Sequence, residues 1–197
     1  SDIFYAHAVS LLEEGLRKHH FDVMLSNTGT DTGRNSKYIT DMAAKHVDAI
    51  ITIGTPFSSE ADIRQLCRIA EHTPIITINS DYHQPNMYSV VCNEKDGMRA
   101  VIHKLAERNY HSILYIYDSL TYSGRQKLSG IQAGLRELGL TASSQLLRQI
   151  PRTLKDAEAL IENLLSNNVY FDAIVTSEDV LAIGAQRAAR RCGRDIP

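Results

Sequence analysis

Residues 49–79 read AIITIGTPFSSEADIRQLCRIAEHTPIITIN. The two ends of this stretch, Ala49–Gly54 and Ile75–Asn79, are short apolar runs rich in isoleucine, which is typical of strands covered on both faces. The segment between them carries apolar residues at the spacing of one helix face: Ile63, Leu66, Cys67 and Ala70. A strand, a helix and a second strand in this order predict a βαβ unit with parallel strands.

The same alternation runs along the rest of the chain. Amphipathic helical segments, the first of them from about Ala6, separate further apolar runs. The further predicted strands are Phe21–Ser26, Tyr88–Asn93, Ile113–Tyr117, Leu146–Ile150 and Ala173–Thr176. We therefore predict an α/β protein of two doubly wound parallel-sheet lobes joined by a hinge, residues 1–109 and 110–197. Both ends are expected to be truncated, because the first helix follows no strand and the chain stops where another strand is due.

Composition narrows the class of protein. The formal net charge is -2, with acidic and basic residues mixed, so the chain offers no basic surface for a nucleic acid. The 3 cysteines are odd in number and without metal-ligand spacing, which favours reduced thiols in a cytoplasmic protein. The apolar runs are too short to cross a bilayer, and no signal peptide opens the chain. We expect no membrane association.

Motifs for catalysis and cofactors are absent from the sequence. No Gly-x-Gly-x-x-Gly follows a predicted strand, and no phosphate-binding loop, Gly-x-Ser-x-Gly or His-Glu-x-x-His occurs. No nucleophile is paired with a base, and no cluster of metal ligands is visible. The sequence therefore predicts a protein that is not an enzyme and that uses no cofactor and no metal.

Ligand-binding residues are expected beyond the carboxyl ends of the strands, where ligands bind in open parallel sheets. The loops at this edge are rich in hydroxyl, amide and carboxylate groups, which suit a polyhydroxylated ligand such as a sugar or a sugar derivative. We predict that the following residues contact it: Phe4, Tyr5, Asn79, Asp96, Tyr122, Arg125, Lys127, Glu178 and Asp179.

Structural roles compete with binding at several of these positions. Phe4 and Tyr5 could stack on a sugar or a nucleobase, or could form a hydrophobic staple for the first helix. Ser123 and Gln126 fit a capping box, and Ser177 fits an N-cap. Acidic side chains such as Glu178 and Asp179 also stabilise a helix amino terminus.

Five segments of the chain resemble the effector domain of LacI/GalR-type transcriptional regulators. The most specific is Ser177–Ala185, SEDVLAIGA, which is similar to the Ala-Asn-Asp-x-x-Ala-x-Gly-Ala of that family. The other four are Asp2–Ala6, Val47–Ile51, Arg108–Ile113 and Arg125–Ile131. Their order and spacing carry the resemblance, which implies a fold like that of type I periplasmic binding proteins. It also implies a homodimer, and operator DNA bound through a helix-turn-helix head that this chain lacks.

The resemblance also implies roles for individual residues. Phe4 and Tyr5 match aromatic ligand contacts, and Asp96 matches an acidic position in the cleft between the lobes. Lys127 stands where the family usually has an arginine, and Glu178 where it usually has an asparagine. The resemblance thus implies a repressor domain whose cleft closes on its effector and so alters operator binding.

Two other functions remain open from the sequence. A periplasmic sugar-binding protein of a transporter shares the expected fold, and a secretion signal upstream would distinguish it from a regulator. A two-lobed α/β enzyme is the third hypothesis, and it would need a catalytic base that the sequence does not single out.

Overall fold

The computed structural model describes residues 3–27, 35–54, 57, 59–140 and 143–194. It divides the chain into two compact units, Ser1–Val91 and Cys92–Pro197. The first unit contains α1 (Ile3–Lys18), α2 (Asn35–Ala43), β1 (Ile50–Ile53), α3 (Glu60–Ala70), β2 (Ile75–Ile78) and β3 (Met87–Val90). The second contains α4 (Glu94–Ala106), β4 (Ile113–Tyr117), α5 (Tyr122–Glu137), β5 (Leu147–Gln149), α6 (Leu154–Ser166), β6 (Ala173–Thr176) and α7 (Asp179–Arg191). Among the described residues, no helix is long and apolar enough to span a bilayer.

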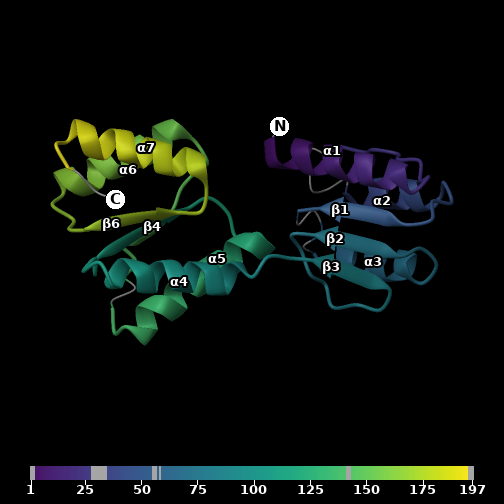
Figure 1. Cartoon of the computed structure of the whole chain (residues 1–197), viewed down its shortest axis with the longest axis horizontal. Coiled ribbons are helices and arrows are strands. Elements are labelled where there is room, and N and C mark those ends of the chain that lie inside the picture. Colours follow the sequence, from purple (N-terminus) through teal and green to yellow (C-terminus); the bar gives the residue numbers. More distant parts are fainter. Residues whose placement is uncertain (1–2, 28–34, 55–56, 58, 141–142, 195–197) are drawn as a thin grey trace. The chain divides into compact units, whose positions relative to one another are not determined.

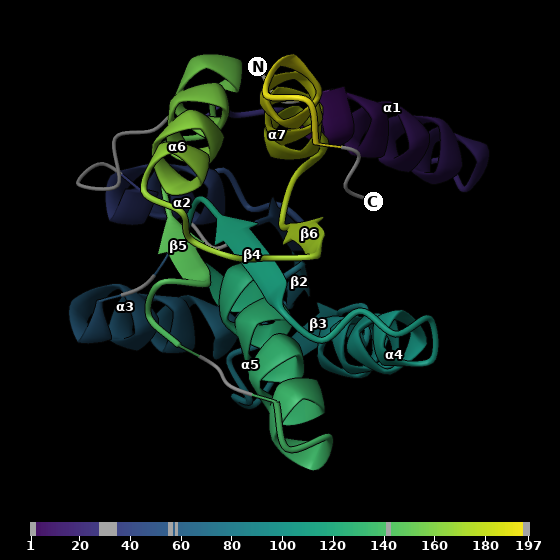
Figure 2. The same cartoon turned by 90° about the vertical axis from the view of Figure 1, so that its left-hand side faces the viewer.

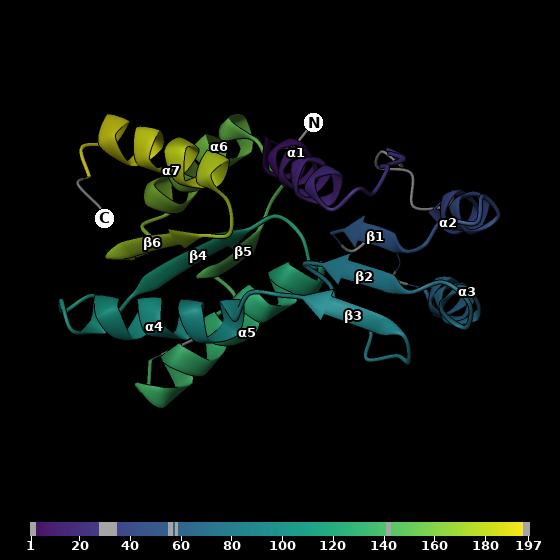
Figure 3. The ribbon, with the colours of Figure 1, turned by 45° about the vertical axis from the view of Figure 1, so that its right-hand side comes forward.

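The first unit is built on a parallel sheet in the order β1-β2-β3, with Ile50 opposite Ile75 and Ile75 opposite Met87. The quoted stretch therefore forms the expected βαβ unit (Figure 3). Leu66 on α3 is fully buried in a cluster that also contains Ile39 of α2. Ser59 caps α3, accepting a hydrogen bond from the Asp62 main-chain N–H, which explains why the helix starts at Glu60.

The second unit is a three-layer arrangement around a parallel sheet in the order β5-β4-β6 (Figures 1 and 2). Strand β4 is apolar throughout because its two faces serve two clusters of buried side chains. Ile113 and Tyr115 pack with side chains of α4 and α5, whereas Leu114 and Ile116 pack with side chains of α6 and α7. The predicted α/β architecture with parallel sheets is confirmed.

Two predicted elements differ from the structure. Phe21–Ser26 is not a strand: it pairs with none of the strands in the described ranges, and Phe21, Met24 and Leu25 are each at least half exposed. Its β-rich composition could not reveal this, because a strand requires a hydrogen-bonding neighbour as well as suitable side chains. The first helix starts at Ile3 rather than near Ala6, so Tyr5 lies in its first turn instead of in a loop. Residues 195–197, expected to lead into another strand, lie outside the described ranges.

The sequence suggested a division between the units after Asn109. In the structure the division falls after Val91. The difference is helix α4, which packs along α5 of the second unit. The two helices are so close that a Cβ at Gly130 would lie 2.2 Å from the carbonyl oxygen of Lys95. Amphipathicity of α4 predicted that the helix buries one face but did not specify its partner.

The hydroxyl of Tyr115 is an unsatisfied polar group in the second core. Tyr115 is fully buried, stacks on Tyr117 with ring centroids 5.5 Å apart, and its hydroxyl has no hydrogen-bond partner among the described residues. Burial raises the pKa of this phenol, and the nearby Asp118 raises it further.

We expect Tyr115→Phe to raise the free energy of unfolding by about 1 kcal/mol, because it removes a buried hydroxyl that makes no hydrogen bond and keeps the ring. Urea denaturation of both proteins measures the difference. A loss of about 1 kcal/mol would instead show that the hydroxyl is hydrogen-bonded, for example to a buried water.

Candidate functional site

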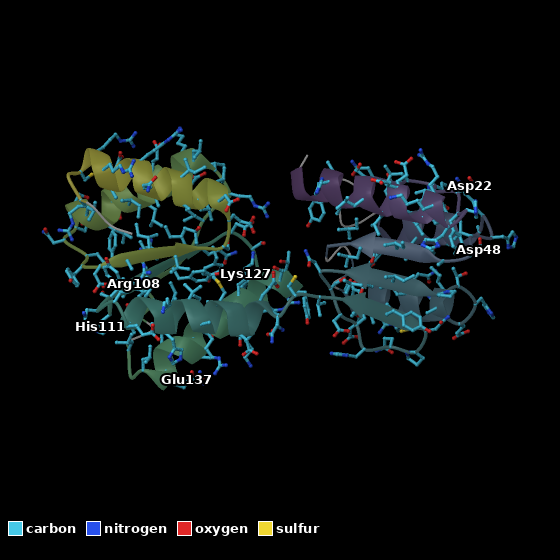
Figure 4. All side chains as sticks on the ribbon, viewed as in Figure 1. Asp22, Asp48, Arg108, His111, Lys127 and Glu137 are labelled. Atoms are coloured by element: carbon cyan, nitrogen blue, oxygen red, sulfur yellow. The ribbon has the colours of Figure 1, made fainter. Side chains whose placement is uncertain are left out.

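The candidate site lies at the edge of the second sheet where its parallel strands end. Asp118 directly follows β4, Ser177 directly follows β6, and Arg152 lies in the loop between β5 and α6. Helices α5 and α7 begin at the same edge, which brings their first turns close to these loops. Figure 4 shows Lys127 of α5 at the end of the unit opposite Arg108 and His111.

Lys127 and Glu178 form the centre of this site. Both were predicted to contact the ligand, and the structure brings them together: the Lys127 Nζ lies 3.5 Å from the Glu178 Oε1. Lys127 also donates a hydrogen bond of 3.0 Å to the main-chain carbonyl of Ser177. The side chains are 22% and 31% exposed, so both remain accessible to a small molecule.

The Glu178 carboxylate lies between two cations. Its Oε2 is 3.7 Å from the Nη1 of Arg152, and its Oε1 faces Lys127. Both distances are longer than a good hydrogen bond, so the attraction is mainly electrostatic. The carboxylate therefore keeps lone pairs that could accept hydrogen bonds from ligand hydroxyls.

Asp118 links the loops that surround this pair. Its side chain is 10% exposed; it accepts hydrogen bonds from the Arg152 Nε at 2.8 Å and from the Ser177 Oγ at 3.2 Å. Its main-chain carbonyl accepts a bond of 3.1 Å from the Gln149 side chain. Burial opposes ionisation of this carboxyl, but the bond and charge of Arg152 outweigh it and hold the pKa of Asp118 below its usual range.

We expect Asp118→Asn to make the protein less sensitive to acid between neutral pH and about pH 3. The lowered pKa means that ionised Asp118 stabilises the fold above the pKa of the unfolded chain. That contribution is lost as the pH falls through the folded pKa. Urea unfolding across this range should show a smaller decline for the variant than for the wild type. Parallel curves would contradict the assignment.

Asp118, Arg152 and Ser177 were not among the predicted ligand contacts. Asp118 follows a predicted strand directly, and Arg152 lies two residues beyond the predicted strand Leu146–Ile150. Asp118 and Ser177 are among the polar residues that follow predicted strands, whereas Arg152 was not recognised among them. The pairing of Asp118 with Arg152 could not have been read, since they are separated by 33 intervening residues and meet only through the sheet.

The other predicted residues of the second unit lie in the first turns of α4, α5 and α7. The Asp96 side chain is 57% exposed and takes part in capping α4: its carboxylate accepts a hydrogen bond of 2.7 Å from the Asn93 amide. Tyr122 is half-buried in the first turn of α5, Arg125 is exposed there and donates to the Leu120 carbonyl, and Asp179 is exposed at the start of α7. Their contact with a ligand stays a prediction.

Two of the predicted capping roles are different in the structure. Thr121 caps α5, accepting from the Gly124 N–H at 3.2 Å, so Ser123 is free to donate to the Glu94 carboxylate instead. The N-cap of α7 is Glu178, whose side chain makes no capping bond, and the Ser177 hydroxyl is engaged with Asp118. Ser177 and Glu178 are therefore available to the site.

Two candidate residues of the first unit, Tyr5 and Asn79, lie at the carboxyl end of its sheet. A Cβ added at Gly54 would lie only 2.9 Å from the Tyr5 hydroxyl. The glycine just after β1 therefore leaves room for this ring. Asn79 follows β2 with a φ of 60°. Phe4 is in α1, and its side chain lies outside the described part of the chain. In the ranges that are described, no group of three or more His, Cys, Asp or Glu side chains could hold a metal ion.

Comparison with known families decides the classification. The model of the periplasmic binding proteins and sugar binding domain of the LacI family matches residues 1–196. The chain belongs to this family. This LacI-family chain is also 36% identical over 199 residues to an HTH-type transcriptional regulator of Lachnoclostridium phytofermentans. It spans 60% of the length of that regulator and all of its own.

Solved structures show the same fold at lower identity. A LacI family transcriptional regulator from Silicibacter pomeroyi superposes with a TM-score of 0.85 at 20% identity, covering 100% of this LacI-family chain and 73% of the other. A regulator from Lactobacillus casei with bound sucrose has a TM-score of 0.80 at 21% identity, covering 98% and 71% of the two chains. The predicted fold, like that of periplasmic binding proteins, is confirmed.

Proposed function

We propose that this chain is the effector-binding part of a LacI-family transcriptional regulator, and that it binds a small polyhydroxylated ligand, a sugar or a sugar derivative. The observation that carries the proposal is the pair of Lys127 and Glu178 at the carboxyl edge of the second sheet. A hydrogen-bond donor and an acceptor 3.5 Å apart suit neighbouring hydroxyls on a sugar ring.

The chemistry of the candidate residues, taken for each unit by itself, supports a sugar-like ligand. Carboxylate and ammonium groups make stronger hydrogen bonds to hydroxyls than neutral groups do, and they fix the orientation of the ligand. Tyr5 offers an aromatic face of the kind on which the C–H face of a sugar stacks. The sucrose bound to the Lactobacillus casei regulator supports the same ligand class.

The regulatory role rests on the relatives. The Lachnoclostridium phytofermentans protein is a helix-turn-helix regulator, which favours regulation of transcription over solute transport or catalysis. We propose that a helix-turn-helix head outside these residues contacts operator DNA, that the regulator is a homodimer, and that it acts in the cytoplasm. Coupling between effector and DNA sites is typically ~1–3 kcal/mol.

A thermal-shift panel tests this function. Neutral mono- and disaccharides, sugar phosphates and nucleosides are each added to the 197-residue chain. A ligand that binds only the native state stabilises it by about 2.7 kcal/mol when present at about 100 Kd. We expect at least one sugar or sugar derivative to raise the Tm, and Glu178→Ala to reduce that rise. A panel in which only nucleosides act, or in which nothing acts, would contradict the proposed ligand class.

A further inference from the structure

We propose that Asp118 is the positioning residue of the ligand site: it holds both cations beside Glu178 in place without touching the ligand. The proposal rests on the proposed function, because it assigns a role within the same site. Its structural content, the dependence of Lys127 and Arg152 on Asp118, can be measured without any ligand.

Asp118 is placed to support the site and not to bind a ligand. Its side chain is 10% exposed, and both carboxylate oxygens already accept hydrogen bonds, Oδ1 from Ser177 and Oδ2 from Arg152. With the side chain only 10% exposed, little of the carboxylate is open to a ligand. Lys127 and Glu178, by contrast, are two to three times more exposed.

The first route from Asp118 runs through Arg152. The Nε of Arg152 donates a hydrogen bond of 2.8 Å to the Asp118 Oδ2, and this bond fixes a long side chain on a loop. The same guanidinium places its Nη1 3.7 Å from the Glu178 Oε2. Because an unrestrained arginine has many rotamers, the bond to Asp118 is what keeps the positive charge beside Glu178.

The second route runs through Ser177. Its hydroxyl donates a hydrogen bond of 3.2 Å to the Asp118 Oδ1. This bond connects the residue after β6 with the residue after β4. The carbonyl of the same serine accepts the 3.0 Å bond from the Lys127 Nζ. Asp118 thus orients the acceptor that holds Lys127, and the two routes together set the position of both cations.

A carboxylate is required at position 118 by the arrangement of donors. An asparagine has nearly the same shape and can still accept from Ser177 through its oxygen. Its NH₂ group would then face the Arg152 Nε, so that two donors oppose each other. Asp118→Asn therefore breaks the Arg152 route while changing the volume of the side chain very little.

Asp172, directly before β6, provides a matched control. Its carboxylate accepts the main-chain N–H groups of His111 and Ser112, both at 2.9 Å, just before β4 begins. His111 lies at the end of the unit away from Lys127 (Figure 4). Like Asp118→Asn, Asp172→Asn removes a negative charge and keeps one acceptor oxygen, so it reports the effect of general destabilisation on the site.

The ligand-free measurement is the reactivity of Lys127 toward an amine-modifying reagent, followed by mass spectrometry at a temperature where each variant is folded. We expect Asp118→Ala, which removes both acceptor oxygens, and Ser177→Ala to raise the Lys127 rate several-fold relative to the exposed Lys104, and Asp172→Ala to leave it unchanged. Ser177→Ala keeps the test valid if Asp118→Ala does not fold. An unchanged Lys127 rate in the folded Asp118 and Ser177 variants overturns the proposal.

The ligand measurement uses the sugar of the panel that raises the Tm most. Calorimetry should show an affinity loss of about tenfold or more for Asp118→Asn, the scale of one charge-assisted hydrogen bond. In an Arg152→Gln background the same change should cost clearly less, because one route is already broken. Equal losses in both backgrounds, or an equal loss in Asp172→Asn, overturn the positioning role. If no sugar binds while Lys127 reactivity responds as expected, the proposed ligand class fails and the positioning role stands.

Discussion

Lys127→Ala is expected to weaken binding of the sugar-like ligand by about 10- to 100-fold, since a hydrogen bond to a charged group contributes ~1.5–3 kcal/mol. Lys127 supplies the donor of the donor–acceptor pair, and its ammonium lies 3.5 Å from the Glu178 carboxylate. Without it, Glu178 retains only the more distant Arg152, at 3.7 Å, as a cationic neighbour among the described residues. Isothermal calorimetry with the sugar found in the panel measures the loss.

Lys104→Ala is the matched control for this prediction. Lys104 lies in α4, its side chain is 68% exposed, and it forms an ion pair with Glu107 three residues later. Its removal should therefore leave ligand affinity unchanged. Lys127→Arg restores the residue type usual in the family and should keep the affinity within about tenfold of wild type. Undiminished affinity in Lys127→Ala would remove this residue from the ligand site.

Gly130→Ala is expected to lower the free energy of unfolding by about 1–3 kcal/mol, the usual cost of overpacking a core. The added Cβ would lie 2.2 Å from the Lys95 carbonyl oxygen and 2.9 Å from the Met98 Cβ. The first of these atoms belongs to the backbone of α4, which cannot rotate away as the end of a side chain can. The two helices must therefore separate, with loss of packing in the cluster that contains Ile102 and Ile131. Denaturant unfolding measures the change.

Gly97→Ala is the control for Gly130 because it lies on the other helix of the same pair and meets no atom within 4 Å. Alanine stabilises a helix interior by about 0.5–1 kcal/mol over glycine, so this variant should gain stability. If Gly130→Ala gained stability as well, helices α4 and α5 would not be in close contact.

The order of elements was determined by the sequence alone. The strands Ile113–Tyr117 and Ala173–Thr176 were predicted with the bounds they have, because a buried parallel strand is a local run of apolar residues. Lys127 and Glu178 were also predicted locally, from their places in the segments that follow two strands, and their contact with a ligand stays a prediction. Parallel strands end at one edge, and this geometric rule is enough to predict that such residues are near one another.

Tertiary structure decided which elements and side chains are partners. Phe21–Ser26 has the composition of a strand but lacks a neighbour to pair with in the described ranges, and α4 joins the second unit through contacts with α5. Asp118 meets Arg152 and Ser177 only because β4 lies between β5 and β6. Periodicity reports which face of an element is apolar, whereas the choice of partner depends on shape and hydrogen bonding between residues far apart in the chain, which no local pattern encodes.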